Sequence, residues 1–159
     1  MDLRITEVTD LDAQWPEIAP LFRALHEYHG PLTGGALAAD WEAVQRDHIG
    51  SVEDGLVLSA RSGDGLVGVA NAHIGRVAPV FRELAFGFLD NMYVLPEVRG
   101  QGVGGTLLAA VEDWCRGRGV EDLRLSVLVA NALGVDVWRA SGFEPVSYVM
   151  SKRLVSERS

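Results

Sequence analysis

The sequence predicts an α/β (α+β) fold, a single domain in which helices cover both faces of a mixed sheet. Strand-like and helix-like apolar patterns follow one another in the order β, α, α, β, β, β, α, β, α, β. The seventh element is a helix that joins two strands as a crossover, and strands joined in this way run parallel. Because the chain has 159 residues with no internal repeat or linker-like stretch, we interpret residues 1–159 as one domain.

The first half of the chain supplies five of these elements. Alternating residues predict a short strand, and apolar residues spaced three and four apart then predict a helix that ends near Gly30-Pro31. After a second helix, two apolar runs flank a tight turn at Gly63-Asp64-Gly65, which predicts a hairpin. The expected elements are strand 3–8, helix 12–28, helix 37–49, and strands 56–61 and 66–74.

The second half supplies the other five elements. An apolar strand runs into a glycine-rich loop and a helix, and LRLSVLV then predicts a strand parallel to the first. Asn131 is a good N-cap for the next helix, and Gly142 is a good residue to end it. The segment PVSYVMSKRL predicts the last strand. The expected elements are strand 84–95, helix 104–116, strand 123–129, helix 131–141 and strand 145–154.

The loop VRGQGVGGTLL, residues 98–108, is the most informative feature of the chain. Four glycines leave it almost without side chains, so backbone N–H groups can approach an anion closely. The helix that follows adds positive potential at its N-terminus, and Arg99 adds a full charge at the rim of the loop. The loop therefore predicts a site for a phosphorylated group, in particular a diphosphate.

Two other glycine motifs fit this loop less well. The dinucleotide motif G-x-G-x-x-G opens a larger α/β domain with an acid at the end of its next strand. Here the strand expected at 123–129 has no acid at its far end. A P-loop needs Gly-Lys-Ser/Thr, but Gly105 and Thr106 follow Gly104 without a lysine. A tight turn alone does not require four glycines in six positions.

A third motif fits in both pattern and context. Arg99-Gly-Gln-Gly-Val-Gly104 resembles R/Q-x-x-G-x-G/A, the acetyl-CoA diphosphate motif of the GNAT superfamily of N-acetyltransferases. The segment MYVLPEVRGQGVGGTLL resembles the strand-loop-helix core of that family. Asn131 and WRASGF at 138–143 resemble its next helix and the Gly-Phe turn. The resemblance rests on these motifs over 86–154, is closest to the polyamine-type members, and extends over 3–85 in element order only.

The resemblance implies a GNAT fold, in which a mostly antiparallel sheet contains one splayed parallel pair. The pantetheine arm of acetyl-CoA would lie in the gap between 90–95 and 125–129. It also implies an acetyl-CoA-dependent N-acetyltransferase that acetylates a primary amine of a small molecule by direct attack in a ternary complex. The residues assigned to acetyl-CoA binding are Met92, Tyr93, Val94, Arg99, Gly100, Gln101, Gly102, Val103, Gly104, Gly105, Thr106, Asn131 and Trp138.

Asp90 is the candidate catalytic base. An amine with a pKa near ~10 is protonated at neutral pH and must lose a proton before it attacks. Asp90 lies four residues before Val94, where many polyamine-like members of the family carry a carboxylate. Glu83 and Glu97 are fallback candidates, and His73, in an apolar strand, is interpreted as a core or sheet-face histidine.

Trp138 departs from the family pattern. Many members place a tyrosine there, as a proton donor to the leaving thiolate, whereas an indole N–H is no practical acid at neutral pH. Tyr93 and Tyr148 occupy no motif position that would replace it. We therefore assign no general acid and expect the thiolate to leave unassisted.

The helices expected over 12–49 are the remaining candidates for an acceptor site. Their aromatic and acidic side chains either line a cationic pocket or serve as core anchors and solvated faces. These residues are Trp15, Glu27, Tyr28, His29, Asp40, Trp41 and Glu42.

Composition limits the classes of partner and the cellular location that we expect for this chain. A net charge of −8 argues against nucleic acid and anionic membranes and is compatible with a cationic substrate. One cysteine, Cys115, and no membrane-length apolar run lead us to expect a cytoplasmic protein. His26 and His29 have helical spacing but no evident third ligand, so we expect no metal. A homodimer is left open.

Three rival functions remain at this point. A non-catalytic acetyl-CoA-binding module would keep the loop and lose the chemistry. An acetyltransferase could act on a protein N-terminus or lysine instead of a small molecule. A dinucleotide-binding enzyme is the most distant alternative.

Overall fold

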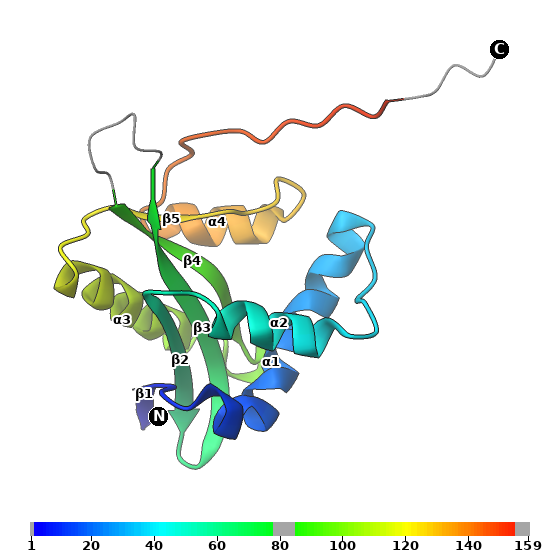
Figure 1. The fold of residues 1–159 in the computed structure, drawn as a ribbon. Coiled ribbons are helices and arrows are strands. Elements are labelled where there is room, and N and C mark those ends of the chain that lie inside the picture. The colour runs from blue at the N-terminus through cyan, green and yellow to red at the C-terminus, as the bar shows by residue number, and fades with distance from the viewer. Residues whose placement is uncertain (1, 78–84, 155–159) are drawn as a thin grey trace.

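The computed structural model describes residues 2–77 and 85–154 and confirms a mixed α/β architecture (Figure 1). Five strands form one sheet in the order β1-β2-β3-β4-β5. The strands are β1 (Leu3–Glu7), β2 (Gly55–Ser62), β3 (Gly65–Arg76), β4 (Ala85–Val94) and β5 (Leu123–Leu125). The helices are α1 (Leu11–Thr33), α2 (Trp41–Gly50), the short 3-10 helix η1 (Pro96–Val98), α3 (Val103–Gly117) and α4 (Ala132–Ala140).

The strand directions follow from the connections. β1 to β4 pair antiparallel, whereas β5 pairs with β4 in parallel, as the crossover helix α3 requires. The parallel pairing is short. It runs from Gly87↔Leu123 to Leu89↔Leu125 and then stops, while β4 continues to Val94.

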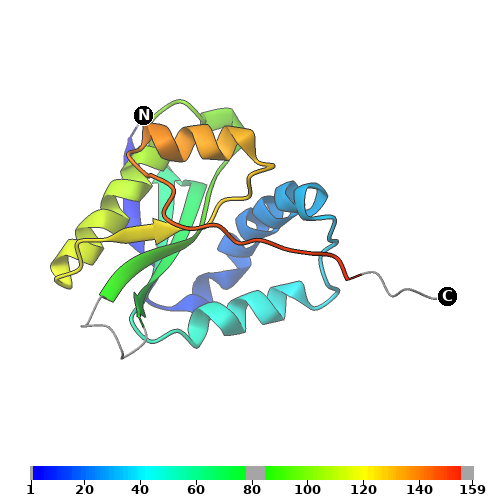
Figure 2. The ribbon, with the colours of Figure 1, turned by 90° about the horizontal axis from the view of Figure 1, so that it is seen from above.

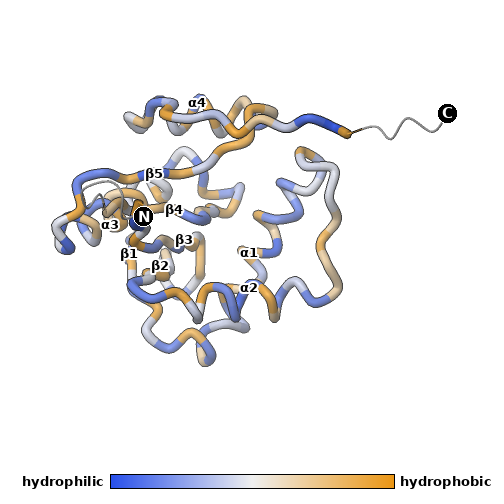
Figure 3. Tube along the Cα trace, turned by 45° about the horizontal axis from the view of Figure 1, so that its top comes forward, coloured by the Kyte–Doolittle hydropathy of each residue, from blue (hydrophilic) through white to orange (hydrophobic). Residues whose placement is uncertain are grey.

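Helices cover both faces of the sheet (Figures 2 and 3). α3 packs on one face through Val103, Leu107 and Val111, each at most 1% exposed. α1 packs on the other face around Phe22, which is fully buried, and Ile49 of α2 joins this second core cluster. The residues of the strands divide accordingly, since successive side chains point to opposite faces.

The first two helices differ from their expected bounds. α1 does not end near Gly30-Pro31 but continues to Thr33 and ends at Gly34, whose φ of 71° is left-handed. Pro31 lies in the last turn, where the Thr33 hydroxyl donates to His29 O and Gly30 O and the Gly35 N–H donates to Gly30 O. These bonds satisfy carbonyl groups that the end of the helix leaves free. α2 begins at Trp41 rather than at 37.

The carboxyl-terminal strands were also overpredicted. LRLSVLV forms a strand only over Leu123–Leu125, because its pairing with β4 ends there. The strand expected at 145–154 is absent: this segment has no strand partner among the described residues and is exposed throughout. Its alternating apolar residues predict a strand, but no strand in the described chain pairs with this segment.

Candidate functional site

The glycine loop forms an open cradle at the N-terminus of α3. Gly100 and Gly102 have φ values of 76° and 88°, which only glycine adopts without strain. A Cβ added at Gly100, Gly102 or Gly105 would meet no atom within 4 Å, so space lies in front of these residues. The first turn of α3 presents backbone N–H groups with no intrahelical acceptor. Such a cradle fits a diphosphate, which the amides of Val103, Gly104 and Gly105 can bind, whereas the Thr106 N–H already donates to Gly102 O.

Contacts within the chain hold the cradle against the end of β4. The Thr106 hydroxyl and backbone N–H both donate to Gly102 O, at 2.9 and 3.0 Å. Gln101 Nε2 donates to Glu97 O at 3.3 Å. Arg99 is exposed and folds back on β4: its Nε donates to Val94 O at 2.9 Å, and its guanidinium lies 5.4 Å from the centre of the Tyr93 ring. The charge of Arg99 is therefore fixed beside the loop.

β4 contains an irregularity next to its unpaired stretch. Asn71 pairs with Asn91 and Ala72 with Leu89, so Asp90 is an extra residue with no partner on β3. Such a bulge bends a strand and redirects its side chains. On the other side, pairing with β5 stops at Leu89. Asp90 therefore begins the part of β4 that β5 leaves uncovered, which is the gap expected between 90–95 and 125–129.

Asp90 is held by His73, a contact that sequence analysis missed. His73 Nδ1 lies 2.7 Å from Asp90 Oδ2, and the two side chains are 31% and 20% exposed. Since an ionised carboxylate only accepts hydrogen bonds, the donor is the Nδ1–H of His73. No described residue bonds to the other oxygen, Oδ1. His73 is thus a half-buried sheet-face histidine, as expected, and its ring also holds the side chain of the candidate base.

A second polar pair lies beside the first. Asn91 Nδ2 donates to Asn71 Oδ1 at 2.9 Å, and Asn71 is only 5% exposed. Asn71 and His73 alternate with apolar residues on β3, so both point to the face that α1 and α2 cover. A sequence signal for this arrangement existed in NAH at 71–73 and DN at 90–91, but the register that brings them together depends on the bulge.

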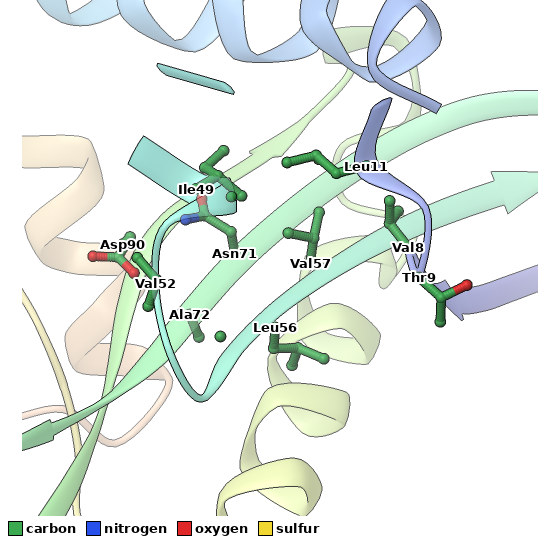
Figure 4. Close-up of a pocket in the computed structure, with 12 residues that line it drawn as sticks. Val8, Thr9, Leu11, Ile49, Val52, Leu56, Val57, Asn71, Ala72 and Asp90 are labelled. Atoms are coloured by element: carbon green, nitrogen blue, oxygen red, sulfur yellow. The ribbon is translucent and has the colours of Figure 1, made fainter. Parts of the chain in front are cut away.

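A cavity of about 160 Å³ opens beside Asp90 on the same face (Figure 4). Val8, just after β1, surrounds it together with Leu11 of α1 and Ile49 of α2, and Asn71 points into it from β3. Among the described residues that line it, Asp90 is the one ionisable group. A cationic group that entered this cavity would therefore meet a carboxylate in otherwise uncharged surroundings.

The aromatic residues of the first two helices are mostly structural. Trp15 is 4% exposed, and its Nε1 donates to Glu42 Oε1 at 3.1 Å. Trp41 packs against the core cluster under α1. Tyr28 is different: it is 47% exposed, and its hydroxyl donates to Asn131 Oδ1 at 3.3 Å, so it joins α1 to the start of α4. The described contacts thus place Trp15 and Trp41 as core anchors rather than in an acceptor pocket.

Asn131 caps α4 as expected, because its Oδ1 accepts the Gly134 N–H at 3.0 Å. Trp138 is half-buried and packs edge-on against Phe143, with ring centres 5.6 Å apart. Met92 and Val94 pack toward α3, whereas Tyr93 packs toward α1. The three residues of β4 assigned to acetyl-CoA are therefore half-buried, and their backbone rather than their side chains borders the gap.

The remaining candidates are the fallback bases and the two histidines of α1. Glu83 falls outside the described residues, and Glu97 is exposed on η1. His26 Nε2 lies 2.8 Å from Gln45 Oε1, and burial together with nearby His26 lowers the pKa of His29. Within 2–77 and 85–154, no three His, Cys, Asp or Glu residues gather closely enough to hold a metal ion. None of the helices in those ranges has the length and apolar character needed to cross a bilayer.

Comparison with known proteins gives one family. The model of the acetyltransferase (GNAT) family matches residues 15–143. An aminoglycoside N(6')-acetyltransferase type 1 of Salmonella typhimurium is 28% identical over 163 residues, which covers 96% of this chain and 98% of the relative. A protein with the same description from Stenotrophomonas maltophilia is 40% identical over 73 residues, 46% of this chain and 48% of its own length.

Other matches are shorter or structural. A thialysine N-epsilon-acetyltransferase of Bos taurus is 35% identical over 60 residues, 38% of this chain and 35% of the relative. Several of the relatives most similar in sequence are thus matched over less than half of their length. The solved structure of AAC(6')-Iy in complex with a bisubstrate analogue, CoA-S-monomethyl-acetylneamine, superposes with a TM-score of 0.77 at 21% identity, covering 98% of this chain and 99% of that one. This likeness supports the fold.

Proposed function

Since the chain belongs to the acetyltransferase (GNAT) family, we propose that it transfers the acetyl group of acetyl-CoA to a primary amine of a small cationic molecule. The observation that carries the proposal is one juxtaposition. The glycine cradle follows β4 and η1 and opens α3, and Asp90 begins the stretch of β4 that β5 leaves uncovered. A diphosphate site and a carboxylate are therefore connected by an open strand edge.

The chain's own groups suit the two halves of such a reaction. Amides at the start of α3 would hold the diphosphate of acetyl-CoA, which supplies a thioester carbonyl for attack. The open edge of β4 would receive the pantetheine arm, where a backbone N–H can stabilise the oxyanion. Arg99 lies at the loop. Asn131 lies at the start of α4, and Trp138 lies on α4.

Asp90 would accept the proton of the ammonium group, directly or through a water molecule. His73 occupies Oδ2 and fixes the plane of the carboxylate, so Oδ1 is the oxygen available to the amine. The neutral amine then attacks the thioester carbonyl in a ternary complex. As the tetrahedral intermediate collapses, the C–S bond breaks, the nitrogen gives its second proton to water, and the CoA thiolate leaves. No described group is required as its acid, consistent with Trp138 at the family's tyrosine position.

We infer that the substrate carries more than one cationic amino group, and aminoglycosides are our first candidates. The relative matched over nearly the full chain is described as an aminoglycoside N(6')-acetyltransferase. The net charge of −8 and a cavity whose ionisable lining group is Asp90 both favour such a molecule. A cavity of about 160 Å³ would admit one aminomethyl group of such a molecule, and the rest of the substrate would lie outside the cavity. We place the reaction in the cytoplasm, as the single cysteine favours.

Two assays test the proposal. Thermal shift with acetyl-CoA, CoA and NADH should show stabilisation by the first two only. Thiol release should then appear with aminoglycosides in a panel that also contains polyamines, thialysine, a lysine peptide and a peptide with a free N-terminus. Binding without release over the whole panel would favour a non-catalytic acetyl-CoA module. Release with the peptides alone would make the chain a protein acetyltransferase.

A further inference from the structure

The bulge in β4 gathers four polar side chains on one face of the sheet. Asn91 bonds to Asn71 at 2.9 Å, and Asp90 bonds to His73 at 2.7 Å. Asn71 and His73 are two residues apart on β3 and therefore share a face. The bulge thus turns two consecutive residues of β4, Asp90 and Asn91, toward that face.

Each of these bonds fixes a side chain and leaves its second polar atom free. Asn71 Oδ1 accepts the Asn91 amide hydrogen, so the other polar atom of Asn71 is the donor Nδ2. No described residue accepts a hydrogen bond from this Nδ2. Asp90 Oδ2 is bonded to His73, and no described residue donates to its Oδ1. One donor and one acceptor are therefore held in fixed orientations and are available to a ligand.

Both side chains line the cavity of about 160 Å³ beside Asp90. Asn71 is 5% exposed, and in Figure 4 its amide nitrogen points into the cavity, toward the side on which Asp90 lies. Apart from two glycines and Thr9, which is exposed, the other lining residues are apolar. A buried amide N–H is costly unless something accepts its hydrogen bond. The cavity therefore suits a group that donates to Asp90 and accepts from Asn71.

This donor and acceptor together discriminate among primary amines. If the ammonium group donates to Asp90 Oδ1, the Asn71 Nδ2 needs an oxygen close to that nitrogen. An oxygen on the same carbon as the nitrogen would make an unstable compound. The nearest stable arrangement is an oxygen on the second carbon, the unit N–C–C–O. A polyamine or a lysine side chain has only methylene groups there and would leave the Asn71 donor unpaired.

We propose that Asn71 is a specificity-determining residue, which selects amines that carry an ether or hydroxyl oxygen on the second carbon from the reactive nitrogen. The inference rests on the proposed acetyl transfer and narrows its acceptor. An aminomethyl group attached beside the ring oxygen of an amino sugar has this arrangement. A peptide N-terminus has a carbonyl oxygen at the same spacing, but it also brings an amide N–H toward walls that are mainly apolar.

The first experiment compares amines that differ in one atom. Tetrahydropyranylmethylamine, substituted beside its ring oxygen, contains the N–C–C–O unit, and cyclohexylmethylamine has a methylene group in place of the oxygen. The native enzyme should release thiol from acetyl-CoA with a kcat/KM about tenfold higher for the ether, because the cyclohexane leaves a buried donor unpaired. Glycinamide represents a peptide N-terminus and should be a poorer substrate than the ether. Equal values for ether and cyclohexane, or a preference for glycinamide, would overturn the proposal.

Two variants test whether Asn71 causes the preference. Asn71→Leu removes the donor at similar volume and should make the two ring amines equivalent. Asn71→Asp keeps an oxygen for the Asn91 N–H but replaces the donor with an acceptor, so it should favour ethylenediamine over the ether. The control Gln45→Leu removes an amide that bonds to His26 outside the cavity lining and should keep the native preference. A folded Asn71→Leu or Asn71→Asp enzyme with the native preference would show that Asn71 does not select the oxygen.

A binding measurement separates this inference from the proposed acetyl transfer. Titration of the two ring amines into the enzyme–CoA complex, followed by nuclear magnetic resonance, gives dissociation constants without turnover. Tighter binding of the ether without thiol release would contradict the acetyl transfer and support the selection by Asn71. Thiol release with equal dissociation constants and equal kcat/KM would support the transfer and contradict the selection. Absence of binding by both amines would also contradict it, because the N–C–C–O unit alone should be recognised.

Discussion

The two ends of the open stretch of β4 differ in the groups that form them, backbone at one end and side chains at the other. At its carboxyl end the cradle consists of backbone: glycines and the first amides of α3 face space that side chains leave open. At its other end the site consists of side chains, because Asp90, His73, Asn71 and Asn91 converge from two strands across a bulge. An anion site needs only local chain geometry, whereas a proton-transfer site needs a tertiary arrangement. The two should therefore respond to different substitutions.

The largest effect is expected at the side-chain end. Asp90→Asn removes the proton acceptor but preserves shape, and loss of a general base typically costs ~10² to 10⁴ in rate. Turnover in the thiol-release assay should fall by that factor. The matched control Asp113→Asn changes an exposed carboxylate on α3 and should leave turnover unchanged. An Asp90→Asn enzyme within about threefold of the native rate would remove Asp90 from the mechanism.

The next effect concerns the backbone end. Gly102→Val places a β-branched residue at a φ of 88°, which it cannot adopt without strain, so the cradle must deform. We expect acetyl-CoA to bind about tenfold more weakly or worse in calorimetry, equivalent to ~1.4 kcal/mol. Gly119→Val imposes the same conflict at a φ of 71° beyond the far end of α3. It should lower stability without weakening acetyl-CoA. Equal affinity in both variants would remove the cradle from the binding site.

The same contrast explains what was predictable from sequence. The loop and the cap at Asn131 depend on residues close together in the chain, and the parallel pair follows from the crossover helix that joins its two strands. The structure has all three. The His73–Asp90 contact depends on residues 17 apart and on a bulge that removes one pairing from the register. The length of β5 and the missing last strand depend on which strands find partners. Alternation of apolar residues reports a preference for a strand but not the presence of a partner.

Trp138, on α4, belongs to neither end, and its substitutions separate packing from chemistry. Trp138→Phe should keep most of the turnover, because it retains the aromatic contact with Phe143. Trp138→Ala should lower the free energy of unfolding by less than the ~3 to 5 kcal/mol of a fully buried aromatic, since Trp138 is half-buried. The control is Trp114→Phe on α3, which should leave turnover unchanged. A faster Trp138→Tyr enzyme would mean that the missing acid limits the rate, and an inactive, folded Trp138→Phe would contradict the packing role.

A smaller effect is expected at Asn131, which caps α4 and accepts a hydrogen bond from Tyr28 of α1. Asn131→Ala removes the cap of α4 and the acceptor of the Tyr28 hydroxyl, so the free energy of unfolding should fall by ~0.5 to 2 kcal/mol. Tyr28→Phe removes the hydroxyl alone and should cost less. We also expect Asn131→Ala to weaken acetyl-CoA binding. Native affinity with lower stability would show that Asn131 serves only as a cap.

The smallest effect is expected at Cys115, away from both ends. It is 3% exposed, and burial raises the pKa of its thiol, so less thiolate is present at neutral pH. A thiol reagent should therefore react with the native protein far more slowly than with the unfolded protein, and the rate should rise with pH. Rapid reaction at neutral pH would show that this region of α3 opens readily.

The separation of the two ends is tested most directly by the acetyl-CoA dissociation constant of Asp90→Asn, measured by calorimetry beside the native chain and Gly102→Val. The account predicts that Asp90→Asn binds acetyl-CoA with native affinity although it has lost turnover, whereas Gly102→Val binds weakly. If Asp90→Asn loses affinity as strongly as Gly102→Val while remaining folded, the carboxylate belongs to the cofactor site, and the division into a backbone end and a side-chain end is wrong.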